Sequence, residues 1–375
     1  MNKRFEALDA FRGLCAISVV IFHMHISGSV TEWDFFRGSY LFVEFFFVLS
    51  GFVLAHGYGF RPNLKFKPFV KARFFRIFPL HIVMLMVMLI LELGKFFAYN
   101  FAGMSFNKIP FTGANAINEI IPNLLLIQSW TSFSDPTSFN IPSWSISIEF
   151  YMYILLFLSI TIFKGNRFIV WLSTSLIALY LLTTQSNIIT NEALRGLSCF
   201  FGGAFIYFIY KKIETIKINF MLGSLLECFL LISIFIILSS NFEYRTIVAI
   251  FTFFITIPIF AFESGVCSYF LKKKPFQTIG HLSFSIYMIH HAFIFILTSY
   301  FMVLQKITGL ELSIMVNNVR TLTTGNILLN NGLVFIVISL IVLTSHFTYK
   351  HIELKWESFG RLKLQRTVQD ESSIL

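Results

Sequence analysis

Charged residues are scarce in this sequence, and cysteine patterns and internal repeats are missing. Asp, Glu, Lys and Arg make up 13% of the 375 residues, whereas a soluble domain has roughly 25%. The four cysteines form neither a Cys-x-x-Cys pair nor a Cys/His cluster. A disulfide framework and a zinc site are therefore not indicated, and we expect no metal. The lack of a repeat argues against a transporter built from inverted halves.

Apolar residues dominate instead, at 56% of the chain. An interior this apolar needs a non-aqueous solvent, so we expect an integral membrane protein with the lipid bilayer as its surroundings. The net charge of +10 invites a nucleic-acid partner, which we reject. The basic residues fall in short clusters between long apolar runs, which is typical of membrane topology signals.

A helix needs roughly 20 mostly apolar residues to cross the hydrocarbon layer. On that basis the sequence predicts an all-α bundle of ten transmembrane helices. The weakest of the ten are the first and the sixth, which contain charged or Gly-rich stretches. The predicted segments are residues 10–28, 39–58, 77–99, 145–163, 167–184, 195–211, 220–240, 245–262, 283–304 and 331–349.

The distribution of Lys and Arg predicts the orientation. With a cytoplasmic N-terminus, 21 of the 29 basic residues fall on the inner side and 6 on the outer side, so we expect both termini to be cytoplasmic. We expect a transmembrane domain over residues 1–350 and a short cytoplasmic tail over 351–375. The first span lacks a cleavage site and is expected to remain as an anchor. A multi-pass protein of a bacterial inner membrane fits this pattern.

Ionisable groups inside predicted spans are costly to bury and are functional candidates by default. Arg12 and His23 are 11 residues apart, which places them on one face of a helix about 16 Å apart. On the same geometry His25 points away from His23. Several such candidates lie inside the spans, namely Arg12, His23, His25, Glu44, Glu149 and His290.

Several motifs, taken in order, resemble the acyltransferase-3 family of membrane O-acyltransferases. Arg12 and His23 resemble its Arg-x10-His motif, and residues 143–149 resemble its Trp-Ser-x-Ser-x-Glu motif. Met152 departs from the family's pattern, where a Phe precedes the Tyr at 153. The remaining matches are residues 43–52 with Glu44, 69–79 with an Arg-x-x-Arg pair, Arg195 with Phe200 and Gly203, 283–291, and 347–353. The resemblance covers nearly the whole chain.

The resemblance implies transfer of an acyl group, commonly acetyl, from cytoplasmic acyl-CoA to a hydroxyl, often of a glycan. A neutral imidazole can remove the hydroxyl proton, and we assign this role to His23. An acyl-histidine relay stays open as an alternative. Glu149, expected at the outer level of His23, is the second catalytic candidate and would orient that imidazole. Acyl-CoA is a substrate here, and no tightly bound cofactor is expected.

The phosphates of the donor call for guanidinium groups at the cytoplasmic side. Arg73 and Arg76 lie on one face at the start of a helix, and Arg12 adds to them. The plain alternative is that the Arg pair only anchors the helix at the membrane surface. Further site candidates are Glu44, Ser50, Arg195, Tyr287 and His290; for Ser50 and Tyr287 helix packing is the alternative.

Two other function classes remain open. A transporter of a lipid-linked or small substrate would also use intramembrane charges, without group transfer. A non-catalytic scaffold would not need buried His and Glu. Neither class needs Arg12 and His23 on one helix face together with a cytoplasmic Arg pair. The sequence does not identify the acceptor, the acyl group or the oligomeric state, and the glycan acceptor rests on the resemblance alone.

Overall fold

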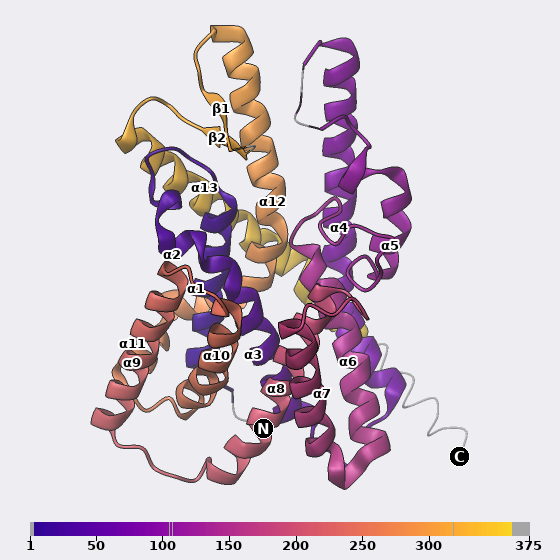
Figure 1. The fold of residues 1–375 in the computed structure, drawn as a ribbon, viewed down its shortest axis with the longest axis vertical. Helices are drawn as coiled ribbons and strands as arrows, with labels where there is room; N and C mark the ends of the chain where they lie inside the picture. The colour runs from indigo at the N-terminus through magenta and orange to yellow at the C-terminus, as the bar shows by residue number, and fades with distance from the viewer. Residues whose placement is uncertain (1–3, 105, 107, 318, 362–375) are drawn as a thin grey trace. The chain divides into compact units, whose positions relative to one another are not determined.

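The computed structural model describes residues 4–104, 106, 108–317 and 319–361, and these residues are mostly helical (Figure 1). The α-helices are α1 (Glu6–His23), α2 (Asp34–Arg37), α3 (Phe42–Tyr58), α4 (Phe66–Phe101), α5 (Ile120–Leu125), α6 (Ser143–Phe163), α7 (Arg167–Thr183), α8 (Asn191–Ile213), α9 (Phe220–Ser239), α10 (Arg245–Phe262), α11 (Val266–Leu271), α12 (Lys274–Thr308) and α13 (Ile327–Thr348). A two-stranded antiparallel sheet is formed by β1 (Ser313–Val316) and β2 (Val319–Leu322). A π-helical stretch, Tyr349–Glu353, continues α13.

In the described part of the chain, eight helical stretches are long and apolar enough to cross a membrane. They support an all-α membrane protein. The ten spans predicted from the sequence differ from these eight stretches at two places. One stretch, Ser143–Thr183, contains both α6 and α7, which the sequence treats as two spans. The helix α1 is not among the eight because it carries Glu6, Asp9 and Arg12 in its first two turns.

Large apolar side chains project outward from these helices. Phe229 on α9 is 67% exposed and Leu343 on α13 is 68% exposed. Such exposure would be costly in water but is favourable against lipid acyl chains. The described helices therefore present the surface that a bilayer requires.

The chain divides into two compact units, which are described here one at a time. The first unit comprises the chain up to His56 together with Cys199–Thr344, and the second comprises Gly57–Ser198 and the chain from Ser345. Three helices, α3, α8 and α13, contribute residues to both units.

In the first unit α1 makes its most extensive contacts with α12. The two backbones approach closely at a pair of glycines. A Cβ on Gly13 would lie 2.6 Å from the backbone nitrogen of Gly280, and a Cβ on Gly280 would lie 2.4 Å from the carbonyl oxygen of Asp9. Small residues permit this approach, as is usual where membrane helices cross.

The segment after α1 is held by the β1–β2 hairpin. The backbone nitrogen of Leu322 donates to the carbonyl oxygen of His25 at 2.9 Å, and that of Ser27 donates to the carbonyl of Leu322 at 2.9 Å. The first predicted span, 10–28, therefore ran too far, because the helix ends at His23 and the chain then turns to an extended conformation. His25 lies outside the helix, so its predicted helical angle was wrong.

The second unit contains α4, α5, α6 and α7. The helix α4 is 36 residues long and begins at Phe66, well before the apolar run predicted from residue 77. Its buried Glu92 accepts hydrogen bonds from Lys95 and from the backbone nitrogen of Phe111, both at 3.0 Å, and from the Asn115 amide at 2.9 Å. These contacts anchor the segment between α4 and α6, in which the described residues form short helical turns and α5.

Candidate functional site

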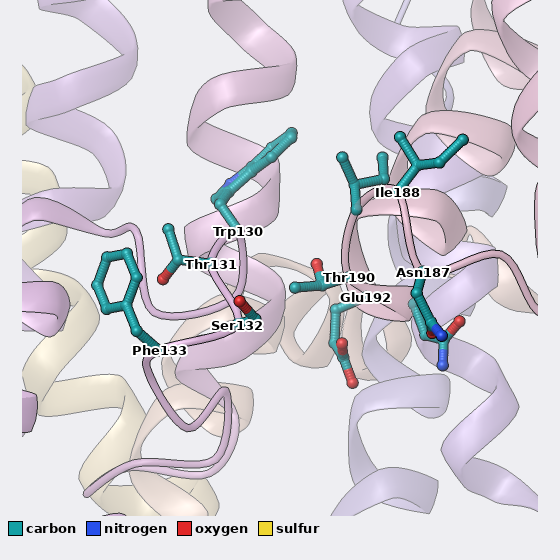
Figure 2. Close-up of a pocket in the computed structure, with 10 residues that line it drawn as sticks. Trp130, Thr131, Ser132, Phe133, Asn187, Ile188, Thr190 and Glu192 are labelled. Carbon is teal, nitrogen blue, oxygen red and sulfur yellow. The ribbon is translucent and has the colours of Figure 1, made fainter.

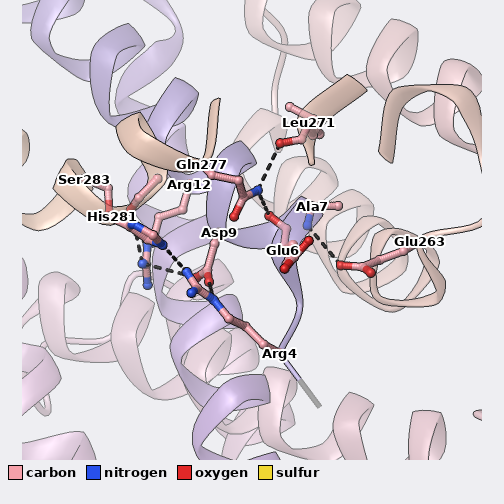
Figure 3. A network of polar contacts seen from close by, with 11 residues as sticks. Arg4, Glu6, Ala7, Asp9, Arg12, Glu263, Leu271, Gln277, His281 and Ser283 are labelled. Carbon is pink, nitrogen blue, oxygen red and sulfur yellow. Dashed lines mark hydrogen bonds and ion pairs between the residues drawn. The ribbon is translucent and has the colours of Figure 1, made fainter. Parts of the chain in front are cut away.

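The first half of the α1–α12 interface carries a polar cluster around Arg12 (Figure 3). The Arg12 Nε donates to the hydroxyl of Ser283 at 2.9 Å, and its Nη2 lies 3.3 Å from a carboxylate oxygen of Asp9. The other carboxylate oxygen of Asp9 accepts from Arg4 at 2.9 Å, and Arg4 also contacts the ring of His281. Arg12 thus links α1 to α12 besides being the predicted donor-binding residue.

The N-terminus of α1 is fixed by two side chains from other elements of the first unit. The Glu263 carboxylate accepts a hydrogen bond from the backbone nitrogen of Ala7 at 3.0 Å. The Gln277 amide donates to the carbonyl oxygens of Glu6 and Leu271, at 2.7 and 3.0 Å. A carboxylate at a helix N-terminus satisfies a free amide and favours the helix dipole. The start of the helix that carries Arg12 is therefore held by hydrogen bonds to two other elements.

At the other end of α1, the predicted residue His23 meets α12. The rings of His23 and His290 are 5.1 Å apart between centroids, with 34° between their planes. His290 is fully buried, whereas His23 keeps a partly exposed side chain. The Tyr287 ring lies 5.9 Å from His290 and 5.7 Å from Phe46 of α3. The structure therefore places Arg12, His23, Tyr287 and His290 along one helix interface.

Arg37 is one of the six basic residues that the charge distribution assigns to the outer side, and the sequence indicated no further role for it. Its Nη2 donates to the carbonyl oxygens of Ile21 at 3.0 Å and Met24 at 2.8 Å, and its Nη1 donates to the Nδ1 of His25 at 3.1 Å. Burial lowers the pKa of Arg37 below its usual value. A cation on the last carbonyls of a helix stabilises its C-terminus. Arg37 thereby holds the last turn of α1, which carries His23. The sequence could not predict this contact because it depends on where α2 lies in the folded chain.

Two further candidates lie on α3. Glu44 is fully buried. Ser50 precedes Gly51, where a Cβ would lie 1.8 Å from the carbonyl oxygen of Phe200 on α8. Gly203 of α8 approaches Val48 in the same way, with a Cβ position 2.0 Å from the Val48 carbonyl. The surroundings of Ser50 therefore accord with the helix-packing alternative, while its chemical role stays a prediction.

In the second unit Glu149 is joined to the arginines of α4. The hydroxyl of Tyr153 donates to Glu149 at 2.5 Å, and the guanidinium of Arg73 lies 5.9 Å from the centre of the Tyr153 ring. Arg73 also donates to the Tyr58 hydroxyl at 3.1 Å. Arg76 is exposed and lies within electrostatic range of Glu149. The sequence predicted Glu149 near the outer side of the membrane and the two arginines near the cytoplasmic side. In the structure Glu149, Arg73 and Arg76 lie in one cluster.

His23 belongs to the first unit and Glu149 to the second, so their expected contact stays a prediction. The guanidinium of Arg195 lies 4.7 Å from the centre of the Trp144 ring, which connects two of the matched motifs. In the described residues no group of three or more His, Cys, Asp or Glu side chains is arranged to hold a metal.

Two features near α9 escaped the sequence reasoning. Glu227 is fully buried and accepts hydrogen bonds from the backbone nitrogens of Gly265 at 3.0 Å and Ser268 at 2.9 Å, which caps α11. The sulfurs of Cys228 and Cys267 are 3.9 Å apart, as free thiols. The two cysteines are far apart in sequence, so no spacing motif could reveal this contact.

Comparisons with known proteins identify the same family that the sequence motifs resemble. A family model described as an acyltransferase domain matches residues 5–349. Acyltransferase MdmB of Streptomyces mycarofaciens is 36% identical over 117 residues, which is 30% of this chain and 26% of that protein. Protein 2 in the picA locus of Rhizobium radiobacter is 42% identical over 92 residues, covering 23% of this chain and 44% of that protein.

A third relative aligns over a greater length. Peptidoglycan O-acetyltransferase OatA of Listeria monocytogenes is 24% identical over 340 residues, which is 79% of this chain and 50% of that protein. The chain thus spans at most about half the length of these curated relatives. No solved structure matches it significantly. Because the family model covers nearly all of the sequence, the chain belongs to the acyltransferase-3 family of acyltransferase domains.

Proposed function

We propose that this chain is a membrane O-acyltransferase, which transfers an acyl group, with acetyl favoured, from cytoplasmic acyl-CoA to a hydroxyl of an envelope or exported glycan. The observation that carries the proposal is the α1–α12 interface, which has Arg12 bonded to Ser283 at one end and His23 against His290 at the other. A relative's name, peptidoglycan O-acetyltransferase, supports acetyl and a glycan. No observation favours the transport alternative.

The proposed chemistry centres on His23. Its imidazole removes the proton of the acceptor hydroxyl while the hydroxyl oxygen forms a bond to the thioester carbonyl carbon. The carbon–sulfur bond breaks, and the leaving CoA sulfur takes up the proton that His23 holds. His290 lies behind His23 and supports its orientation. An acyl-histidine relay, in which His23 first carries the acyl group, remains the alternative.

We assign the donor to the arginines. Arg73 and Arg76 follow one another on the first part of α4, and an exposed guanidinium such as Arg76 suits the phosphates of CoA. Arg12 is the third donor-binding candidate. We further propose ten spans with both termini cytoplasmic, which counts α1 as a span and separates α6 from α7. This topology gives the protein an inner-membrane location, with the donor arriving from inside and the acceptor from outside.

The test is acyl transfer in membranes that contain the wild type, His23→Ala or His346→Ala, using radiolabelled acetyl-CoA and extracted envelope glycans. His346 is an exposed histidine on α13 and serves as the matched control. We expect wild type and His346→Ala to label the glycans equally, and His23→Ala to lose about 100-fold or more, the range of a general base. Equal labelling by all three proteins at equal expression would remove His23 from the mechanism.

A further inference from the structure

A pocket of about 560 Å³ lies in the second unit, away from the residues that the motifs single out. One wall is formed by residues 130–133, which precede α6. The other is formed by residues 187–192, which comprise the end of the α7–α8 connection and the start of α8. Figure 2 shows residues 130–133 on one side and residues 187–192 on the other, with Ser132 and Thr190 between the outlying Phe133 and Asn187. The volume lies within the roughly 300–1,000 Å³ typical of small-molecule sites.

The two walls are fixed to each other and to α6. The hydroxyl of Thr190 donates to the carbonyl oxygen of Ser129 at 2.5 Å, which ties the second wall to the base of the first. The indole nitrogen of Trp130 donates to the carbonyl of Ser147 at 3.1 Å, and its ring lies 5.7 Å from that of Tyr151. The pocket is therefore built before any ligand arrives, which lowers the entropic cost of binding.

The lining combines aromatic rings with hydrogen-bonding groups. Trp130 and Phe133 supply the rings, and Phe133 is 70% exposed although it is large and apolar. Asn187 and Asn191 supply amides, and Glu192 supplies a carboxylate. A sugar ring has an apolar C–H face and a rim of hydroxyl groups, so it needs both an aromatic surface and such polar partners.

The acidic side chain in the pocket restricts the class of sugar that can bind. Glu192 is the acidic side chain of the pocket lining, and the lining includes no Lys or Arg. A carboxylate accepts hydrogen bonds from hydroxyl and amide groups but repels another anion. The lining thus suits a neutral hexose or N-acetylhexosamine and disfavours uronic acids and phosphorylated sugars.

The predicted topology puts this pocket on the acceptor's side of the membrane. The helices α6 and α7 are joined by the short turn Lys164–Asn166, so the start of α6 and the end of α7 lie on the same side. Both walls lie next to these ends. The Lys and Arg distribution assigns them to the outer side, which an exported glycan would approach.

We propose that this pocket is a sugar subsite for the glycan, which binds one neutral hexose or N-acetylhexosamine unit stacked on Phe133 and Trp130, with Glu192 excluding acidic sugars. This inference rests on the proposed function, because it names the substrate class of the same reaction. It adds a binding site formed by residues that lie outside the matched motifs.

The test measures binding of two probes to the purified full chain in lipid nanodiscs, without acyl-CoA. The neutral probe is chitotetraose and the acidic probe is tetragalacturonate, and isothermal titration gives the dissociation constants. We expect chitotetraose to bind wild type and to bind Phe133→Ala about tenfold more weakly. Phe101→Ala, which changes an 80% exposed phenylalanine at the end of α4, is the matched control and should bind as wild type does.

Two variants test the polar contacts. Asn187→Ala should also weaken chitotetraose binding, and Glu192→Gln should allow tetragalacturonate to bind where wild type does not. Equal affinity of wild type, Phe133→Ala and Asn187→Ala for chitotetraose would overturn the subsite. So would a failure of wild type to bind chitotetraose at millimolar concentration.

Failure of the subsite and failure of the proposed function give different results. If wild type transfers acetyl to glycans and Phe133→Ala does so with an unchanged acceptor KM, the subsite is wrong and the acyltransferase stands. If no transfer occurs but chitotetraose binding depends on Phe133, the subsite stands and the acyltransferase is wrong.

Discussion

At the scale of single residues, the histidines of the α1–α12 interface differ in their access to solvent. His23 is partly exposed and His290 is fully buried behind it. An accessible imidazole can meet a substrate hydroxyl, and a buried neighbour can restrict its orientation. The sequence placed His23 and Arg12 on one helix face, but it did not place His290 against His23, because the two residues are 267 positions apart and meet only through the helix crossing.

Arg37 gives a prediction at this scale. Arg37→Ala removes the donors to the carbonyls of Ile21 and Met24 and frees the turn that carries His23. A displacement of about 1 Å of a catalytic group can cost 100-fold in rate. We therefore expect acyl-transfer kcat to fall at least about tenfold in Arg37→Ala, with the acyl-CoA KM little changed. Arg37→Lys should recover part of the loss.

Steady-state kinetics in membranes distinguishes a role of Arg37 in positioning His23 from a role in binding the donor. A rise in the acyl-CoA KM with unchanged kcat would mean that Arg37 acts on the donor instead. Wild-type kinetics in Arg37→Ala would show that the α1 C-terminus needs no cap from α2.

At the scale of elements, hydropathy predicts the apolar part of each long helix but not its ends. The predicted span 77–99 lies inside α4, which begins at Phe66, because basic residues near a membrane surface continue the helix without adding hydropathy. The predicted span 10–28 overran α1 because Met24 and Ile26 continue the apolar run beyond the end of the helix. The backbone of this segment instead pairs with Leu322 of β2. Hairpin pairing of this kind leaves no mark on a hydropathy profile.

The glycine crossing gives a prediction at the element scale. Gly13→Ala places a methyl group 2.6 Å from the backbone of α12, so the two helices must separate. We expect a loss of stability of about 1–3 kcal/mol, with a lower Tm and a lower acyl-transfer rate, because the His23–His290 contact depends on this crossing.

Gly94→Ala is the matched control for this prediction. Gly94 lies in α4, and a Cβ there meets nothing within 4 Å. Alanine is the better helix former, so this variant should be neutral or slightly stabilising. Thermal unfolding of both variants in one detergent checks the pair. An unchanged Tm and rate in Gly13→Ala would contradict the close crossing.

At the scale of the whole molecule, composition and apolar runs predicted the membrane class, and the ordered motifs predicted the family. The buried carboxylates were less predictable. Glu92 and Glu227 are ionisable residues in apolar helices, yet both hold backbone amides of neighbouring segments. Their partners come from turns whose positions the sequence does not reveal. An intramembrane carboxylate therefore needs its partners known before a catalytic role is assigned.

Acyl transfer by this protein can be measured directly in proteoliposomes with acetyl-CoA inside and chitotetraose outside. Free CoA thiol and acetyl ester are quantified together, for wild type and His23→Ala. We expect equal molar amounts of the two products with wild type and neither product with His23→Ala. Movement of chitotetraose into the liposomes without CoA release or ester formation would contradict this expectation and favour a transporter.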